Sequence, residues 1–234
     1  MTLIWEGLVR AFWLVVTADS EVLGITRLSL EVSGAATLLS LLAGLPTGTV
    51  LALTRFRGRA LLVSLVNTGM GLPPVVVGLG LSILLWRGGP LGVLELLYTP
   101  AAIVLAQFVI AAPVVTGLTL AAVQQIPDRF RLQMLALGAS RGQLLWILLR
   151  EARLPMLAAL MAGFGAVISE VGASLMVGGN IRGQTRVLTT ATVLEAGKGN
   201  FDVAIALSVI LLGVTFLVNW GLTWIQQRGR SDHG

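Results

Sequence analysis

The sequence contains no cysteine, which excludes disulfide bonds, thiolate metal sites and a cysteine nucleophile. Its single histidine, His233, stands at the end of the chain, where we expect a solvated tail. A Ser-His pair and a His/Asp/Glu metal set are therefore missing, which makes an intramembrane enzyme the least favoured class. The phosphate-binding pattern G-x-x-x-x-G-K-[ST] is also missing, because the Gly197-Lys198 pair is followed by another glycine. We expect no catalysis, no metal and no cofactor in this chain.

Charged residues are scarce as well, at 12% of the chain. Soluble domains carry about 25%. Hydrophobic residues make up 56%, and the mean hydropathy is +0.89. A packed core cannot hide so much apolar surface, so we expect much of it to face lipid. The net charge of +5 is then explained by orientation signals and lipid-phosphate contacts, and no nucleic-acid partner is expected.

The apolar runs predict an all-α, polytopic membrane bundle. A spanning helix needs about 20 mostly apolar residues. Five stretches qualify: 28–53, 60–86, 99–123, 154–178 and 201–225. We divide the chain into an N-terminal amphipathic segment, 1–24, a transmembrane domain, 25–226, and a cytoplasmic tail, 227–234.

The opening run from Leu3 to Val16 is shorter than the five predicted spans. It carries Glu6 and Arg10 at i,i+4, a pairing that suits the surface of a helix. We interpret this run as an interfacial helix, and a sixth span is the alternative.

Ten of the 16 basic residues fall on one side of the predicted spans. They are Arg55, Arg57, Arg59, Arg129, Arg131, Arg141, Arg150, Arg153, Arg228 and Arg230. Because cytoplasmic loops are enriched in Arg and Lys, this side is predicted to be cytoplasmic. The C-terminus is then inside and the N-terminus outside, in a multi-pass protein of the cytoplasmic (inner) membrane.

Proline and glycine interrupt four of the five predicted spans. Pro46 and Pro113 lie inside two of them, "GLPPVVVGLG" (71–80) interrupts another, and "GFGAVISEVGASLMVGG" (163–179) is rich in glycine. Neighbouring helices or a polar cavity must satisfy the backbone groups that such residues free. This pattern favours a bundle that moves or encloses a path over a membrane assembly factor. An ion-coupled secondary transporter stays open, although it usually needs more intramembrane charges and internal repeats.

An amphipathic segment lies between the third and fourth spans. "ALGASRGQLLWILLREARLP" (136–155) resembles the cytoplasmic coupling loop of permease subunits of ATP-binding-cassette importers, with Gly138 at the glycine of that loop. The Glu-Ala-Ala of the family pattern is Leu132-Gln133-Met134 here, and the glycine lies four residues farther than usual from the closing Leu-Pro. The resemblance implies that a helix from about 132 to 150, within a loop of about 127–155, docks on a separate ATPase. The ATPase-coupling residues would be Gly138, Ala139, Ser140, Arg141, Leu154 and Pro155.

The segments "SEVGAS" (169–174), "GGNIRGQTRVLTTA" (178–191) and "KGNFDVAIAL" (198–207) resemble the oxyanion-importing branch of these permeases, and its tungstate permeases most. The resemblance implies that this chain forms the translocation pathway for tungstate, with molybdate or sulfate as alternatives. It also implies a homodimer of the permease, an extracytoplasmic oxyanion-binding protein, and ATP and Mg²⁺ held by the ATPase.

Glu170 is the one carboxylate deep in a predicted span, where an unpaired charge costs at least ~2.5 kcal/mol. We interpret it as a structural or gate residue, because a carboxylate repels a dianion; direct contact with the passage is the alternative. Pathway candidates of a second kind are threonines near a predicted outer amphipathic helix, 185–196. Their neutral hydroxyls can donate to an oxyanion, or they can satisfy backbone groups. These are Thr185, Thr189, Thr190 and Thr192.

Arg182 and Arg186 lie beside this predicted outer helix. We expect them to contact either lipid phosphate or the binding protein that delivers the substrate.

Overall fold

The structure, a computed structural model, describes residues 2–231, so His233 lies outside the described residues. Within this range the chain is helical and contains no strand, which confirms the predicted fold class. The helices are α1 (Thr2–Val16), α2 (Ser20–Leu53), α3 (Arg59–Met70), α4 (Pro74–Leu85), η1 (Gly92–Leu94, a 3-10 turn), α5 (Pro100–Gln124), α6 (Asp128–Ala136), α7 (Arg141–Glu151), α8 (Arg153–Ile168), α9 (Gly172–Gly178), α10 (Leu188–Gly197) and α11 (Phe201–Ser231).

Among the described residues, three helices are long and apolar enough to cross a membrane: α2, α5 and α11. Two further pairs reach that length only if each counts as one bent span: α3 with α4, at 103°, and α7 with α8, at 62°. The count of five is therefore approximate. The predicted spans 60–86 and 154–178 are each divided, into α3 and α4 and into α8 and α9.

The long helices begin where the sequence supplies caps. The Asp19 carboxylate accepts from the backbone N–H groups of Glu21 and Val22, at 3.1 and 3.0 Å, and so satisfies free donors at the start of α2. The Thr99 hydroxyl accepts from Ala102 at the start of α5. Pro100 follows as the first helical residue, where its missing N–H costs nothing.

The predicted interruptions at Pro46 and Pro113 were wrong, because α2 and α5 continue through both prolines. Each proline removes one hydrogen bond, and tight packing between the two helices holds them in register. A Cβ at Gly44 would lie 2.9 Å from the Val115 side chain, and one at Gly48 would lie 2.5 Å from a backbone oxygen of α5. Small residues at such contacts let two membrane helices approach closely.

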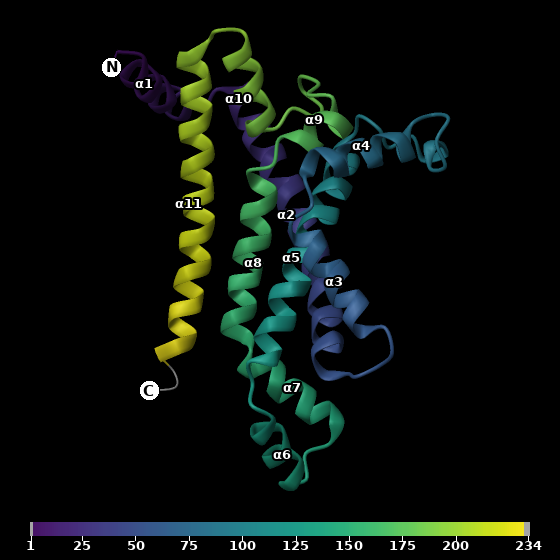
Figure 1. The fold of residues 1–234 in the computed structure, drawn as a ribbon. Helices are drawn as coiled ribbons and strands as arrows, with labels where there is room; N and C mark the ends of the chain where they lie inside the picture. Colours follow the sequence, from purple (N-terminus) through teal and green to yellow (C-terminus); the bar gives the residue numbers. More distant parts are fainter. Residues whose placement is uncertain (1, 232–234) are drawn as a thin grey trace.

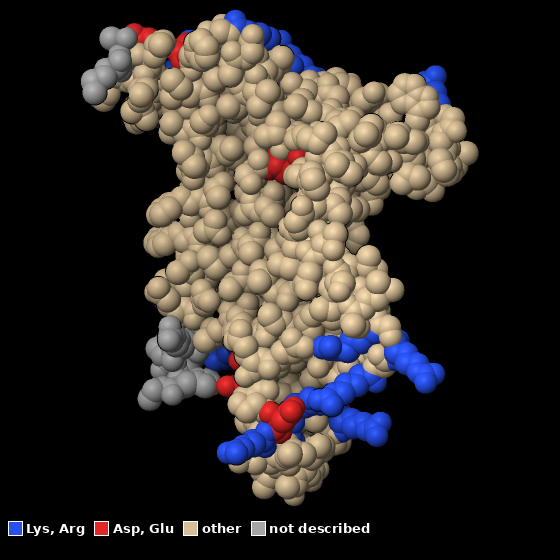
Figure 2. Space-filling view, in the orientation of Figure 1, with Lys and Arg blue, Asp and Glu red and all other residues tan. Residues whose placement is uncertain are grey.

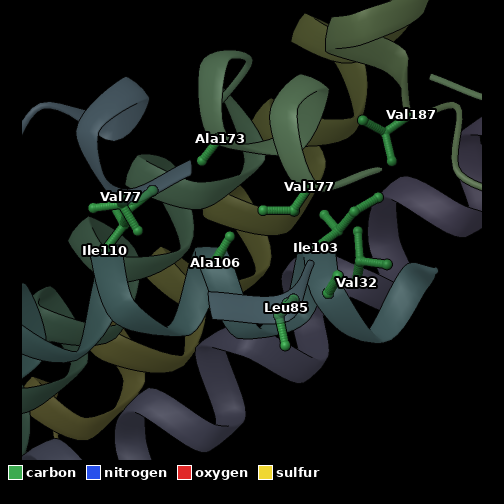
Figure 3. Packing of buried hydrophobic residues seen from close by; sticks show 10 residues of the cluster. Val32, Val77, Leu85, Ile103, Ala106, Ile110, Ala173, Val177 and Val187 are labelled. Carbon is green, nitrogen blue, oxygen red and sulfur yellow. The ribbon is translucent and has the colours of Figure 1, made fainter. Parts of the chain in front are cut away.

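A core of small and branched side chains joins α4 and α9 to α5 (Figure 3). Val77 of α4, Ala173 and Val177 of α9, and Ile103 and Ala106 of α5 are all buried there. A Cβ at Gly78 would lie 2.7 Å from the Cα of Ala173, so α4 and α9 are in direct backbone contact. The half-helices α4 and α9, one from each divided span, therefore form one packed unit.

The helix α1 packs against the start of α11 at one end of the bundle (Figure 1). At 15 residues, about 22 Å, it is shorter than the ~30 Å hydrocarbon core, which suits the interfacial interpretation. The expected pairing of Glu6 with Arg10 was wrong, because Arg10 binds Asp202 of α11 at 2.6 Å instead. Because α1 packs on α11, Arg10 pairs with the Asp202 carboxylate of α11 and not with Glu6 on its own helix.

The two ends of the bundle differ in charge. The loop between α2 and α3, the α6–α7 segment and the end of α11 lie together at the end away from α1 (Figure 1). Figure 2 shows extended basic side chains gathered at that end, below a broad band that is almost uncharged. The three basic segments assigned to one side from the sequence thus share one end of the molecule.

Candidate functional site

The predicted coupling helix, 132–150, is two helices in the structure. The helix α6 ends at Ala136, and α7 begins at Arg141. The turn between them has Gly138 at φ +86°, a conformation that glycine adopts without the strain of a β-carbon. Ser140 then caps α7: its hydroxyl accepts from Gln143 N–H, while the Gln143 side chain accepts from Ser140 N–H.

The space around Gly138 is open, because a Cβ built there would meet no atom within 4 Å. The requirement for glycine within this chain is therefore its backbone angle alone. Ala139 completes the turn by donating its N–H to the Met134 carbonyl at 3.0 Å. The turn presents its backbone outward at the end of the molecule farthest from α1 (Figure 1).

The helix α7 leads directly into the bundle. Leu148 is buried, while Trp146 is exposed and carries the Arg150 guanidinium over its ring at 5.3 Å. Leu154 and Pro155 lie in the first turn of α8, as expected for a proline whose N–H would have no helical partner. The helices α6 and α7 form a short arm that meets α8 at a 62° bend. The expected coupling residues lie along this arm or in the first turn of α8.

Glu170 lies at the break between α8 and α9 and is buried, at 5% exposure. Its carboxylate accepts from Ala173 N–H at 2.7 Å, Ser174 N–H at 2.9 Å and the Ser174 hydroxyl at 2.7 Å. These amides belong to the first turn of α9, which has no partners of its own for them. The side chain therefore caps the half-helix from one residue before the usual capping position.

Two more groups hold the same break. The Thr189 hydroxyl donates to the Glu170 carbonyl at 2.9 Å, and the Gln107 side-chain amide donates to the Val167 carbonyl at 3.1 Å. Gln107 comes from α5 and is buried, with its own carbonyl oxygen unpartnered. Sequence reasoning missed Gln107 and Ser174; a polar residue inside the apolar run 99–123 was the available signal for Gln107.

The four candidate threonines do not form one hydroxyl stripe. Thr185 precedes α10 and donates to the Gly178 carbonyl at 2.5 Å, while Thr190 exchanges hydrogen bonds with the backbone of Val187. Thr192 donates to the Leu188 carbonyl at 2.8 Å. With Thr189 on the Glu170 carbonyl, all four hydroxyl protons are engaged by backbone oxygens in this conformation.

The two candidate arginines meet at one carboxylate. Glu21, in the first turn of α2, accepts from Arg182 and lies 3.5 Å from the Arg186 guanidinium. The bond to Glu21 raises the pKa of Arg182 above its ordinary value. Glu21 was missed from the sequence, and its ion pairs join the 181–187 loop to the first turn of α2.

The end of α10 carries its own polar cluster. Asn200 and Lys198 both donate to the Glu195 carboxylate, at 2.8 and 2.7 Å, and they lower its pKa below the ordinary 4.5. These hydrogen bonds stabilise the turn between α10 and α11, in which Gly199 has a φ of +82°.

A family of known proteins matches most of this chain. Residues 44–231 fit the binding-protein-dependent transport system inner membrane component family. The chain belongs to this family. The permease is therefore a multi-pass membrane protein of ATP-binding-cassette importers, as the sequence resemblance implied.

Named relatives align over most of the permease. A probable anion ABC transporter permease protein of Haloferax volcanii is 44% identical over 83% of this chain and 86% of its own length. The tungstate uptake system permease protein TupB of Peptoclostridium acidaminophilum is 36% identical over 94% and 96%. The molybdenum transport system permease protein ModB of Escherichia coli is 28% identical over 88% and 94%.

The fold has solved counterparts. An inward-facing structure of the MetNI methionine ABC transporter matches with a TM-score of 0.74 at 19% identity, over 93% of this chain and 96% of that chain. At this identity the match shows the shared fold, which is that of type I importer permeases.

Proposed function

We propose that the permease imports an oxyanion, with tungstate as the foremost substrate and molybdate or sulfate as the alternatives. The observation that carries this proposal is the alignment with TupB over nearly the whole chain, at higher identity than with ModB. The segments that suggested tungstate, at 169–174, 178–191 and 198–207, coincide with the break around Glu170 and with the outer α10–α11 region.

The permease works in this proposal with three partners. A separate ATPase holds ATP and Mg²⁺ and receives the α6–α7 arm, an extracytoplasmic binding protein delivers the oxyanion, and a second copy of the permease completes the pathway. The arm supports the first partner, because it projects beyond the membrane-spanning helices at the basic end (Figures 1 and 2). The basic end is then cytoplasmic, with the N-terminus outside and the C-terminus inside.

Movement passes through the bend between α7 and α8. When the ATPase moves the arm, α8 is moved with it, because Leu148 and Ala152 are buried at the bend. The other end of α8 is the break held by Gln107, Glu170 and Thr189. Glu170 acts there as a structural gate residue, since its carboxylate is fully engaged by α9.

Uptake by purified components tests this function. The permease, its ATPase and its binding protein are reconstituted in vesicles, and tungstate uptake is measured with ATP, without ATP and with an ATPase variant that cannot hydrolyse ATP. We expect uptake with active ATPase only. Competition by molybdate and sulfate ranks the three oxyanions.

Two results would contradict the proposal. Uptake driven by an ion gradient without ATP would indicate a secondary transporter. If ATP drives the uptake of none of the three oxyanions, the proposed class of substrate is wrong.

A further inference from the structure

The helix α3 carries a stripe of three polar side chains. Ser64, Asn67 and Thr68 lie at i, i+3 and i+4, so they share one face of the helix. All three are exposed, and the Thr68 hydroxyl donates to the Ser64 carbonyl at 2.8 Å. The face that packs on α5 is a different one, because Val66 and Met70 are the side chains that approach Gly117.

The stripe lies deep in the membrane. Asn67 is eight residues from Arg59, the basic residue that begins α3. At 1.5 Å per residue this places it about 12 Å from the basic end of the helix, against a hydrocarbon core of about 30 Å. An amide facing lipid at this depth loses its hydrogen bonds with water, which is costly. The stripe must therefore face water or protein.

The bend between α3 and α4, at residues 71–74, indicates that this region faces water. Pro73 and Pro74 lack N–H groups, so they cannot donate to the Gly69 and Met70 carbonyls as a continuous helix would. Leu72 N–H recovers the Gly69 carbonyl at 3.3 Å, and residues 71–76 are exposed. Irregular backbone at membrane depth is tolerated only where it is buried in protein or lines a water-filled cavity.

Asn67 also has the donors that an oxyanion requires. Within the part of the chain that the structure describes, its amide forms no hydrogen bond, so both N–H groups are free. The candidate threonine hydroxyls, in contrast, donate to backbone carbonyls, and Glu170 offers a negative charge. A neutral donor holds an anion weakly enough to release it, as transit requires.

We infer that the Ser64–Asn67–Thr68 face of α3 lines the water-filled passage and that the Asn67 amide donates hydrogen bonds to the oxyanion in transit. The inference rests on the proposed oxyanion import and assigns a contact within it. The occupant is a hydrated tetrahedral dianion, recognised by neutral N–H donors.

Accessibility of single cysteines tests whether the Ser64–Asn67–Thr68 face lines a water-filled passage. The permease has no cysteine of its own, so Asn67→Cys and Leu65→Cys each carry one thiol. Leu65 is exposed and lies at nearly the same depth, about 200° around the helix from Asn67. A charged, membrane-impermeant thiol reagent is applied in vesicles without nucleotide and with ATP plus vanadate. We expect fast labelling at position 67 in at least one state and slow labelling at position 65 in both.

Equal, slow labelling at both positions in both states would overturn the inference, since position 67 would then face lipid or protein. Slower labelling at position 67 in the presence of tungstate would support the passage further.

Measurements of uptake test whether the Asn67 amide donates hydrogen bonds to the oxyanion. Asn67→Asp keeps the size of the side chain but replaces the donors with a negative charge, and Leu65→Ala is the control. We expect Asn67→Asp to lower tungstate uptake roughly ten- to a hundredfold, the value of one charge-assisted hydrogen bond, and Leu65→Ala to keep uptake near that of the wild type.

Normal uptake by Asn67→Asp would contradict the proposed hydrogen bond between the Asn67 amide and the oxyanion. The two proposals fail separately: wild-type permease that takes up no oxyanion refutes the function, whereas normal wild-type uptake with an unlabelled position 67 refutes only this inference.

Discussion

Glu170 offers the sharpest test of how the broken span is held. Its carboxylate satisfies two buried amides, of Ala173 and Ser174, and one hydroxyl. Glu170→Ala leaves both amides without a partner, at about 1–3 kcal/mol each, or roughly 2–6 kcal/mol together. A chain of this size loses about 2–4 °C of melting temperature per kcal/mol. We therefore expect Glu170→Ala to melt at least roughly 4 °C below the wild type.

Glu170→Gln should be milder. Its side-chain oxygen still accepts from Ala173 N–H, and its new amide can donate to the Ser174 hydroxyl, which then accepts instead of donating. Only Ser174 N–H loses its partner, so the expected cost is about 1–3 kcal/mol. Tungstate uptake should follow the same order, with Glu170→Gln retaining more than Glu170→Ala.

Thermal unfolding of the purified variants in one detergent, at one scan rate, gives the stability order, and vesicle uptake gives the functional order. A Glu170→Ala protein as stable as Glu170→Gln would refute the capping role. Complete loss of uptake in both variants, with wild-type stability, would mean that a charge or proton is required, as in an ion-coupled transporter.

Three further tests address the coupling arm and the packing. A cysteine at Gly142 should be labelled only from the cytoplasm and one at Gly199 only from outside; the reverse pattern would place the arm beyond reach of an ATPase. Gly138→Val should fold and insert but lose ATPase co-purification or stimulated hydrolysis, since a β-branched residue strongly disfavours the φ of +86°; Gly142→Ala, in α7, is the harmless control. Gly48→Leu should lower the melting temperature sharply by separating α2 from α5, whereas Gly34→Leu, with open space around it, should not.

Some features of the arm and the breaks could be predicted from local sequence. The pair Pro73-Pro74 predicted a broken span because proline lacks the donor that a helix needs. The division of the coupling segment was also readable, since Ser140 followed by Gln143 is a capping box after a glycine. The prediction of one helix from 132 to 150 was wrong because it followed the family pattern and gave no weight to this capping box.

Other features required the tertiary structure. Pro46 and Pro113 are single prolines that each remove one helical donor, yet α2 and α5 continue through them. Both helices pack closely on each other at Gly44 and Gly48, a contact that no local pattern reveals. Likewise Gln107 contacts a carbonyl 60 positions away, so its role at the α8–α9 break depends on how α5 and α8 meet.

The threonines and Asn67 show why residue type alone misplaces a passage. A hydroxyl in a helix can return its proton to a carbonyl one turn earlier, as Thr192 does with Leu188 and Thr68 with Ser64. A run of threonines is therefore weak evidence for donors that face a substrate. The Asn67 amide, on an exposed face of α3, forms no such bond among the described residues, and it lies just before the proline pair Pro73-Pro74 that ends this half of the span. A free amide at membrane depth is the stronger signal, and among the described residues the Asn67 amide on α3 is such a group.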